Sequence, residues 1–298
     1  GEAQCLKDTA KSFAEERSPI THFRSLRDMS DPILWDKNIW NEMSKLGWPG
    51  IMIPEEFGGS NFGLSGICVV LQECAKTVTP SPLFASGVLG AYAINNYGTK
   101  EQKEKYLPLI ASGELTTSIA VDESSHHNPY DTLLIAKKSS DEYILSGKKN
   151  FVIDGTSSDL LIVLARTSGK KGDLTGLTLF LVDPTNEGID RIKLEIADSR
   201  NYANIIFDNV KISSKNILGD IEAGGEAIDD VLDIGRIAMS AEMLGNSEAA
   251  FETTLDYLKQ RKQFGVLIGS FQALQHRAAE MFCEIELTKS SVIAAMRA

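Results

Sequence analysis

Hydrophobic residues in the first part of the chain recur at helical spacing. Leu6, Ala10 and Phe13 lie four and three residues apart, which places them on one face of a helix. Farther along, Thr99 followed three residues later by Gln102 has the pattern of a capped helix start. The first part of the chain is therefore predicted to be a helical domain.

The period of the pattern then changes from 3.6 to 2. Short apolar or alternating runs are separated by turn-rich segments such as Gly169–Asp173. The runs cover residues 116–121, 133–137, 143–146, 160–164, 177–182 and 204–207. Short strands without a helical pattern between them predict an antiparallel barrel or sandwich.

The helical period returns after about Gly225. Ile237, Ala241 and Leu244 step by four and three, as in a long amphipathic helix, and residues 273–296 predict a second helix. That second helix shows no C-terminal stop signal, so we expect the helical bundle to be incomplete in this sequence.

These changes of period divide the chain into three expected domains. They are an N-terminal helical domain over 1–113, a central β-domain over 114–222 and a C-terminal helical bundle over 223–298. The fold class is therefore α+β, in the chain order α, β, α.

Composition narrows the possible partners. The 298 residues include 30 Lys plus Arg and 41 Asp plus Glu, which gives a formal net charge of −11, and 43% are hydrophobic. Such a composition argues against extended disorder, and the acidic balance argues against non-specific binding of nucleic acid. A phosphate-bearing ligand stays possible, because it needs only a local pocket.

Cysteine and histidine give no sign of a metal site. None of the four cysteines forms a CxxC pair, and Cys68 and Cys74 are predicted to be small core residues, as in a reducing cytoplasm. His126 and His127 are adjacent, so their side chains point in different directions on a regular element. No apolar run reaches about 18 residues, and no signal-peptide pattern is present. We expect a soluble cytoplasmic protein without metal and without membrane attachment.

Four strings, in this order along the chain, resemble the acyl-CoA dehydrogenase family. They are Gly47–Gly59, Gly98–Pro108, Phe207–Gly219 and Arg261–Gln272. The resemblance implies a flavoprotein that uses FAD to oxidise an acyl-CoA thioester to its trans-2-enoyl form. A carboxylate base removes the α-proton while the β-hydrogen leaves as hydride to the flavin. It also implies an oligomer, with an electron-transfer flavoprotein as the electron acceptor.

The resemblance assigns cofactor and substrate roles to five residues of the third domain. Arg261 matches the arginine that reaches the FAD pyrophosphate, and Phe264 and Gln272 match positions on the same half of the cofactor. Asp233 and Arg236 match the family's substrate-side pair. Without the resemblance, Arg261 is equally a solvated helix end, and an Asp–Arg pair at i and i+3 is commonly a helix salt bridge.

Around the expected flavin ring the chain departs from the family. The residues from Asp122 to Asp131 replace a glycine-containing string, so close backbone approach to a ligand is in question; Asn128 in this stretch is the expected substrate contact. Phe151 matches an aromatic position that can stack on the flavin. Ile153 replaces a threonine whose hydroxyl bonds the flavin. Both side chains are equally compatible with an apolar core.

The catalytic base is not identified. Some family members carry it one residue before the arginine that Arg236 matches, and that position is Gly235 here. Most others carry a glutamate whose matching position lies beyond residue 298. Glu242, on the same predicted helix, is expected to be a solvated carboxylate.

Three functions remain open at this level. The first is a conventional homotetrameric acyl-CoA dehydrogenase of fatty acid oxidation. The second is a catalytically impaired partner subunit of a heteromeric enzyme, of the type that degrades steroid side chains. The third is an oxidase or a CoA-ligand-binding protein on the same fold.

Overall fold

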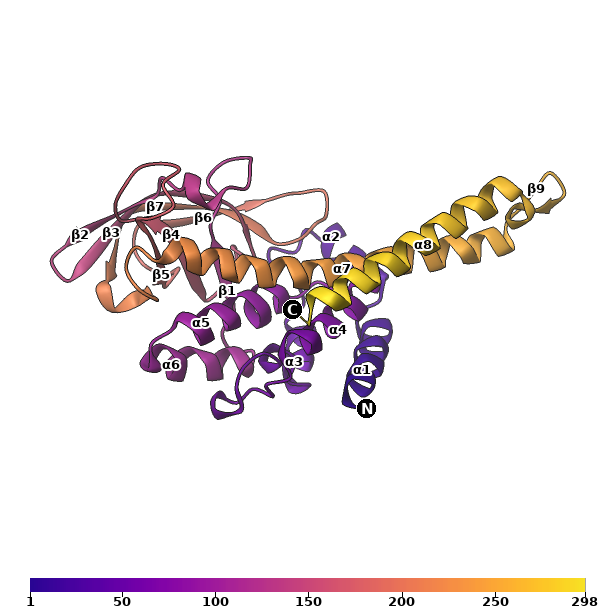
Figure 1. Ribbon diagram of the computed structural model, residues 1–298, viewed down its shortest axis with the longest axis horizontal. Coiled ribbons are helices and arrows are strands. Elements are labelled where there is room, and N and C mark those ends of the chain that lie inside the picture. Colours follow the sequence, from indigo (N-terminus) through magenta and orange to yellow (C-terminus); the bar gives the residue numbers. More distant parts are fainter. Residues whose placement is uncertain (298) are drawn as a thin grey trace. The chain divides into compact units, whose positions relative to one another are not determined.

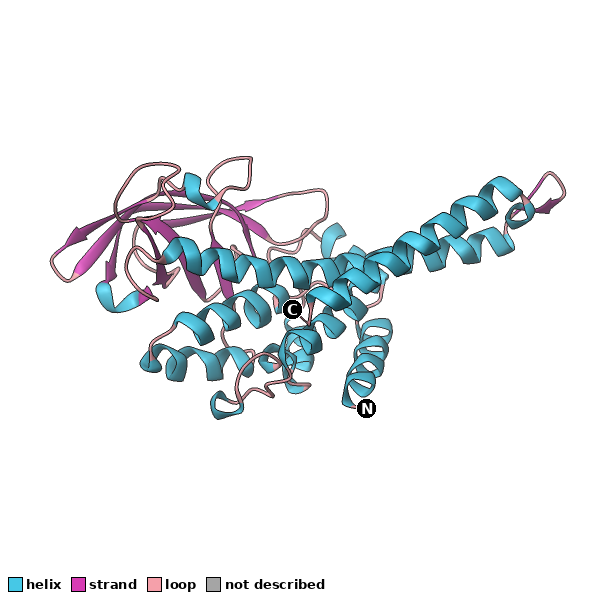
Figure 2. Ribbon diagram, viewed as in Figure 1, coloured by secondary structure: helices cyan, strands magenta, loops and turns pink. Residues whose placement is uncertain are grey.

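The computed structural model describes residues 1–297, and the elements follow the order helices, strands, helices (Figure 1, Figure 2). The first helices are α1 (Glu2–Arg17), α2 (Ile20–Asp28), α3 (Lys37–Lys45), α4 (Gly63–Lys76), α5 (Ala91–Tyr97) and α6 (Lys100–Ala111). Short helices η1 (Trp48–Gly50), η2 (Glu55–Phe57), η4 (Pro129–Asp131), η5 (Ser214–Asn216) and η6 (Ile268–Ser270) occupy loops, and η3 (Leu83–Gly90) is a π-helix. The predicted α–β–α order is confirmed.

The chain forms two compact units. Unit 1 contains Gly1–Phe23, Leu64–Thr79 and the residues from Arg236 onward, and unit 2 contains Arg24–Gly63 and Pro80–Gly235. Helix α7 (Gly224–Gln260) begins in unit 2 and continues in unit 1.

Unit 2 is built on an eight-stranded sheet with strand order β6-β7-β3-β2-β4-β5-β8, and β1 pairs with β4. The strands are β1 (Thr117–Ala120), β2 (Ile135–Ser139), β3 (Glu142–Ile153), β4 (Leu160–Arg166), β5 (Leu177–Val182), β6 (Ile189–Leu194), β7 (Tyr202–Ser213) and β8 (Ile217–Leu218). β4 and β5 are buried at every position, because their sequences are almost continuously apolar. The predicted central β-domain is confirmed, but β1 and β2 each run parallel to β4, so the sheet is mixed.

The buried π-helix η3 packs against β1 at one end of the sheet. A Cβ on Gly90 would lie 1.9 Å from Oγ1 of Thr117, so only glycine permits this approach. Thr117 donates its hydroxyl to the carbonyl of Ala85 at 2.9 Å, and its backbone N–H donates to Oγ of Ser86, also at 2.9 Å. η3 is thereby fixed to the sheet that carries the candidate site.

Unit 1 contains helices α1, α4 and α8 (Gln272–Ala295) together with most of α7. A Cβ on Gly245 of α7 would lie 2.0 Å from the carbonyl oxygen of Gln72, so α7 and α4 are in backbone contact. Beside this crossing, Lys76 pairs with buried Glu73 at 3.2 Å and with Glu248 at 3.1 Å. None of the helices in residues 1–297 combines the length and the apolar character that a membrane span requires.

Candidate functional site

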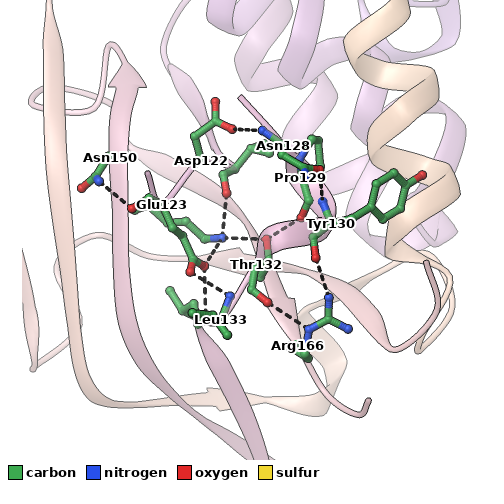
Figure 3. Close-up of polar contacts among 12 residues, drawn as sticks. Asp122, Glu123, Asn128, Pro129, Tyr130, Thr132, Leu133, Asn150 and Arg166 are labelled. Carbon is green, nitrogen blue, oxygen red and sulfur yellow. Dashed lines mark hydrogen bonds and ion pairs between the residues drawn. The ribbon is translucent and has the colours of Figure 1, made fainter. Parts of the chain in front are cut away.

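A buried lysine organises the segment that follows strand β1. Lys149, on β3, has no exposed surface, and its ammonium donates to the carbonyl of Val121 at 2.8 Å and to Oε1 of Glu123 at 2.7 Å. A longer contact of 3.3 Å reaches Oγ1 of Thr132. Figure 3 shows Glu123 and Thr132, from the two ends of this segment, on either side of the contacts. Burial lowers the pKa of Lys149 to about 8, against the opposing effect of the Glu123 carboxylate.

The carboxylate of Glu123 is saturated with hydrogen bonds. Besides Lys149, it accepts from the backbone N–H groups of Leu133 at 2.7 Å and Leu134 at 2.9 Å. The side chain of Asn150 donates to the carbonyl of Glu123 at 2.7 Å. The ion pair therefore connects β3 with both the start of the segment and the residues just before β2.

Arg166, at the end of β4, is a second buried cation that binds the same segment. Its Nε donates to the carbonyl of Thr132, and Nη2 donates to the carbonyl of Tyr130, both at 2.9 Å. Its remaining contacts are to the carbonyls of Ser168, Asp173 and Thr175 in the β4–β5 turn. We call residues 122–134 the anchored segment, because these two cations hold it.

Asn128 lies on the exposed part of the anchored segment. Its Oδ1 accepts from the backbone N–H of Tyr130 at 3.2 Å, and within residues 1–297 its amide nitrogen has no hydrogen-bond partner. The hydroxyl of Tyr130 donates to Asp229 on α7. Asp233 follows Asp229 by four residues, on the same face of the helix. Tyr130, two residues after Asn128, therefore contacts α7 one turn before Asp233, and Arg236 lies three residues farther along that helix.

Phe151 stands on a β-bulge. The register between β3 and β7 shifts between Lys149 and Val152, and Phe151 adopts φ +52° with its side chain 50% exposed. Its N–H donates to Oδ1 of Asn204 at 3.2 Å. Ile153, at the end of β3, is half-buried opposite Tyr202. The alternative that Phe151 belongs to the core is therefore wrong, because the bulge turns its ring outward.

Gly235, the expected position of the base in some relatives, is crowded. A Cβ on Gly235 would lie 2.7 Å from Cδ2 of the buried Leu89 and 3.7 Å from Cζ of Phe84. Any side chain at this position therefore requires Leu89 to move.

Three of the expected cofactor residues lie together in unit 1, in the connection between α7 and α8. Arg261 directly precedes a hairpin formed by β9 (Lys262–Gln263) and β10 (Val266–Leu267), and Gln272 begins α8. Phe264 at the hairpin turn is 92% exposed, has φ +55° and meets Phe271 edge-on at 6.2 Å between ring centroids. The side chains of Arg261, Phe264 and Gln272 are all exposed. We call residues 261–272 the exposed tip, since these side chains are accessible to solvent or to another molecule.

The sequence reasoning missed Lys149, Glu123 and Arg166. One signal for Lys149 was available: it continues the inward positions Tyr143 and Leu145 of the alternating strand, where a lysine requires a buried partner. Glu123 and Arg166 carried no comparable signal, because their partners are mostly backbone groups.

Three family models match the chain in succession. They are the N-terminal domain of acyl-CoA dehydrogenase over residues 1–114, the middle domain over 122–210 and the C-terminal domain over 222–298.

Individual relatives agree with these models. The chain is 32% identical to a 3-(aryl)acrylate reductase of Clostridium sporogenes (strain ATCC 15579), covering 96% of this chain and 76% of that protein. It is also 32% identical to the mitochondrial short/branched chain specific acyl-CoA dehydrogenase of Bos taurus, covering 97% and 67%. Among solved structures, butyryl-CoA dehydrogenase from Megasphaera elsdenii matches with a TM-score of 0.89 and 29% identity, over 98% of this chain and 78% of that one.

Proposed function

Because the chain belongs to the acyl-CoA dehydrogenase family, we propose that it binds FAD and removes two hydrogens from an acyl-CoA thioester to give the trans-2-enoyl-CoA. FAD is the cofactor of this family, whose members are oxidoreductases. The observation that carries the proposal is the ring of Phe151, presented outward on a strained bulge beside the anchored segment.

The chemistry of the available side chains fits FAD in both units. In unit 2, half-exposed Phe151 offers a flat apolar surface to an aromatic ring. In unit 1, exposed Arg261 offers a planar guanidinium to phosphate oxygens, and Gln272 offers an amide. Ile153 has no hydrogen-bonding group, so the ring is held by one hydrogen bond fewer than in relatives with threonine.

In the proposed mechanism FAD, when bound, supplies the acceptor for the β-hydrogen of the substrate. Phe151 would stack on the flavin ring and exclude water from it. Asn128 and Asp233 of unit 2 would orient the CoA thioester, and fixed donors would stabilise the negative charge that develops on its oxygen. Arg236, where unit 1 begins, is a proposed substrate contact from the family resemblance alone. The base must lie within hydrogen-bond reach of the α-proton, and Gly235 has no group to serve as one.

Several finer features belong to the same proposal. The physiological form is an oligomer, because Arg261, Phe264 and Gln272 are exposed together and reach a cofactor seated mainly on another subunit in the resembled family. An electron-transfer flavoprotein is the proposed acceptor, and the location is cytoplasmic. The domain boundaries near residues 113 and 222 stay predictions.

A second candidate is the impaired partner subunit of a heteromeric acyl-CoA dehydrogenase. Two observations favour it: Leu89 fills the space beside Gly235, and Ile153 lacks a donor for the flavin. In this case the chain contributes phosphate contacts and structure, while another subunit supplies the base.

One experiment separates the two candidates. The chain is purified alone, its flavin content is read from the visible spectrum, and straight, branched and aryl acyl-CoA thioesters are assayed with an artificial electron acceptor. Stoichiometric FAD and enoyl-CoA formation support the independent enzyme. Flavin retention and activity that appear only with a co-expressed homologous subunit support the partner role. If the chain neither retains flavin nor shows activity, with or without that subunit, the proposal is contradicted.

A further inference from the structure

We propose that Lys149 is a positioning residue, whose ammonium group holds the anchored segment in the shape in which it meets its ligand. The inference rests on the proposed function, because the ligand used to test it is FAD. Nothing in the sequence pattern assigned a role to Lys149, and it does not reach the surface that a ligand would contact.

Lys149 connects the two ends of the anchored segment. The ammonium binds Val121 just before the segment, Glu123 near its start and Thr132 near its end. A single buried group therefore draws both ends of the segment to one point. The residues from Asp122 to Asp131 include no glycine, so the backbone has fewer accessible conformations, and its course depends on where the ends are fixed.

The pair of Lys149 and Glu123 also shapes the surface of the segment. A hollow of about 230 Å³ lies between the anchored segment and β3. Its lining includes Glu123, Ser124, Asn128 and Leu133. Glu123 is at once a wall of the hollow and the partner of Lys149, and it also binds the N–H groups of Leu133 and Leu134. Loss of the ammonium would leave this carboxylate charge only 13% exposed and without a counter-ion, and would release the wall of the hollow.

The charge of Lys149, and with it the ion pair, depends on pH. Burial lowers the pKa of Lys149 to about 8; Glu123 and Asp122 oppose that shift, and Arg166 adds to it. As pH rises through this value, Lys149 becomes a neutral amine, so Glu123 loses its counter-ion and the segment loses one of its two cationic anchors. The stability of the fold responds in the opposite direction. Since the pKa in the folded state lies below the ordinary value of 10.5, the unfolded state binds more protons between these two values, and this group's contribution to the free energy of unfolding increases with pH.

If Lys149 only stabilised the fold, FAD affinity and stability would change in the same direction with pH. If it positions the segment, the two change in opposite directions. Over the interval above about pH 8, FAD affinity should fall while the contribution of Lys149 to stability rises. Over the same pH interval, the backbone amides of Leu133 and Leu134 should become less protected against hydrogen exchange.

The test compares the full chain with the variant Lys149→Met and with Lys138→Met as the matched control. Lys138 is an exposed lysine on the neighbouring strand β2 and makes no ion pair within residues 1–297. Hydrogen exchange of peptides spanning residues 122–134 is measured by mass spectrometry and corrected for the intrinsic rate at each pH. FAD affinity is measured by flavin fluorescence titration from about pH 7 to about pH 9.5, a range that includes the pKa of Lys149.

We expect the wild-type dissociation constant for FAD to rise about tenfold across this range. Lys149→Met should show a dissociation constant about tenfold higher already at pH 7, no further step with pH, and faster exchange in the segment. Lys138→Met should behave as the wild type does. An unchanged pH step in Lys149→Met, or a segment as well protected as in the wild type, would overturn the proposal.

A double variant, Lys149→Met with Glu123→Gln, guards against a folding defect, because it removes both buried charges together. We expect its unfolding midpoint to approach that of the wild type while FAD affinity and segment protection stay low. Recovery of all three would show that the pair only stabilises the fold. If the wild type binds no FAD at any pH, the proposed function fails, and the exchange data alone decide whether Lys149 fixes the segment.

Discussion

The anchored segment of unit 2 and the exposed tip of unit 1 differ in how their candidate ligand-binding groups are held. In the segment, two buried cations hold the backbone through carbonyls and one carboxylate, so its shape exists before any ligand arrives. At the tip, Arg261 and Phe264 project into solvent. The difference teaches that the segment is preorganised within the chain, whereas the side chains of the tip are left for a binding molecule to contact.

The strongest test of this comparison is to remove the second anchor. Arg166→Met removes a buried guanidinium that donates to five backbone carbonyls, of which the Thr132 carbonyl is fully buried, so the free energy of unfolding should fall by about 3 kcal/mol. Urea unfolding followed by tryptophan fluorescence measures the change. A loss below about 1 kcal/mol, typical of an exposed arginine, would contradict the view that the segment is anchored from within.

Removal of the arginine at the tip should change stability little and FAD affinity strongly. Arg261→Met is expected to change the free energy of unfolding by less than about 0.5 kcal/mol, because the side chain is exposed. FAD affinity should nevertheless fall by about 10- to 100-fold through the loss of charged hydrogen bonds to phosphate. Titration of apoprotein with FAD and with riboflavin, which lacks the pyrophosphate, locates the effect: a riboflavin affinity that falls equally would place Arg261 away from the phosphates.

Ile153→Thr tests whether a hydrogen bond to the flavin ring is missing in unit 2. A hydroxyl at this half-buried position restores one donor, and we expect FAD affinity to rise by about tenfold at most, equivalent to about 0.5–1.5 kcal/mol. Riboflavin titration should show the same gain, since the ring is common to both ligands. Ile153→Val is the control, because it changes the volume without adding a donor, and an equal gain with valine would point to packing instead.

The smallest effect on the folded chain is expected at Phe264. With 92% of its surface exposed, Phe264→Ser should leave the unfolding midpoint of the isolated chain within error. It should weaken self-association or association with a partner subunit, as measured by sedimentation velocity. Unchanged association would argue that the tip does not contact another subunit.

Local patterns predicted most of the elements but not how they pair. The 3.6-residue and 2-residue periods located the main helices and most strands of the sheet, but β6 (Ile189–Leu194) was missed, and β3 and β7 are longer than predicted. The predicted cap at Thr99 is confirmed, with reciprocal bonds to Gln102 of 3.2 and 3.0 Å. The parallel pairing of β1 with β4 was not predictable, because a strand's period carries no information about the direction of its neighbour.

The candidate site was only partly predictable for a related reason. Arg261 lies in a distinctive string, so its place near Phe264 and Gln272 followed from the sequence. The orientation of Phe151 depends on a bulge that shifts the register by tertiary pairing with β7, and residue types alone do not reveal it. The inward position of Lys149 does not name its partner, and Glu123 looks like a surface residue until it is paired, because burial of either charge is acceptable only in the presence of the other.

The pairing of Glu123 with Lys149 also limits how this protein can be altered or can evolve. The two residues are 26 positions apart, so the conformation of the segment is encoded partly outside the segment. A segment grafted from a glycine-containing relative would leave Lys149 buried without its carboxylate unless that relative also supplies one. This segment, moved into another scaffold, would in turn require the lysine to move with it. The anchored segment and the strand that carries Lys149 therefore have to be exchanged together. Chimeras whose junction lies between Glu123 and Lys149 should fold poorly more often than chimeras whose junction lies before Glu123 or after Lys149.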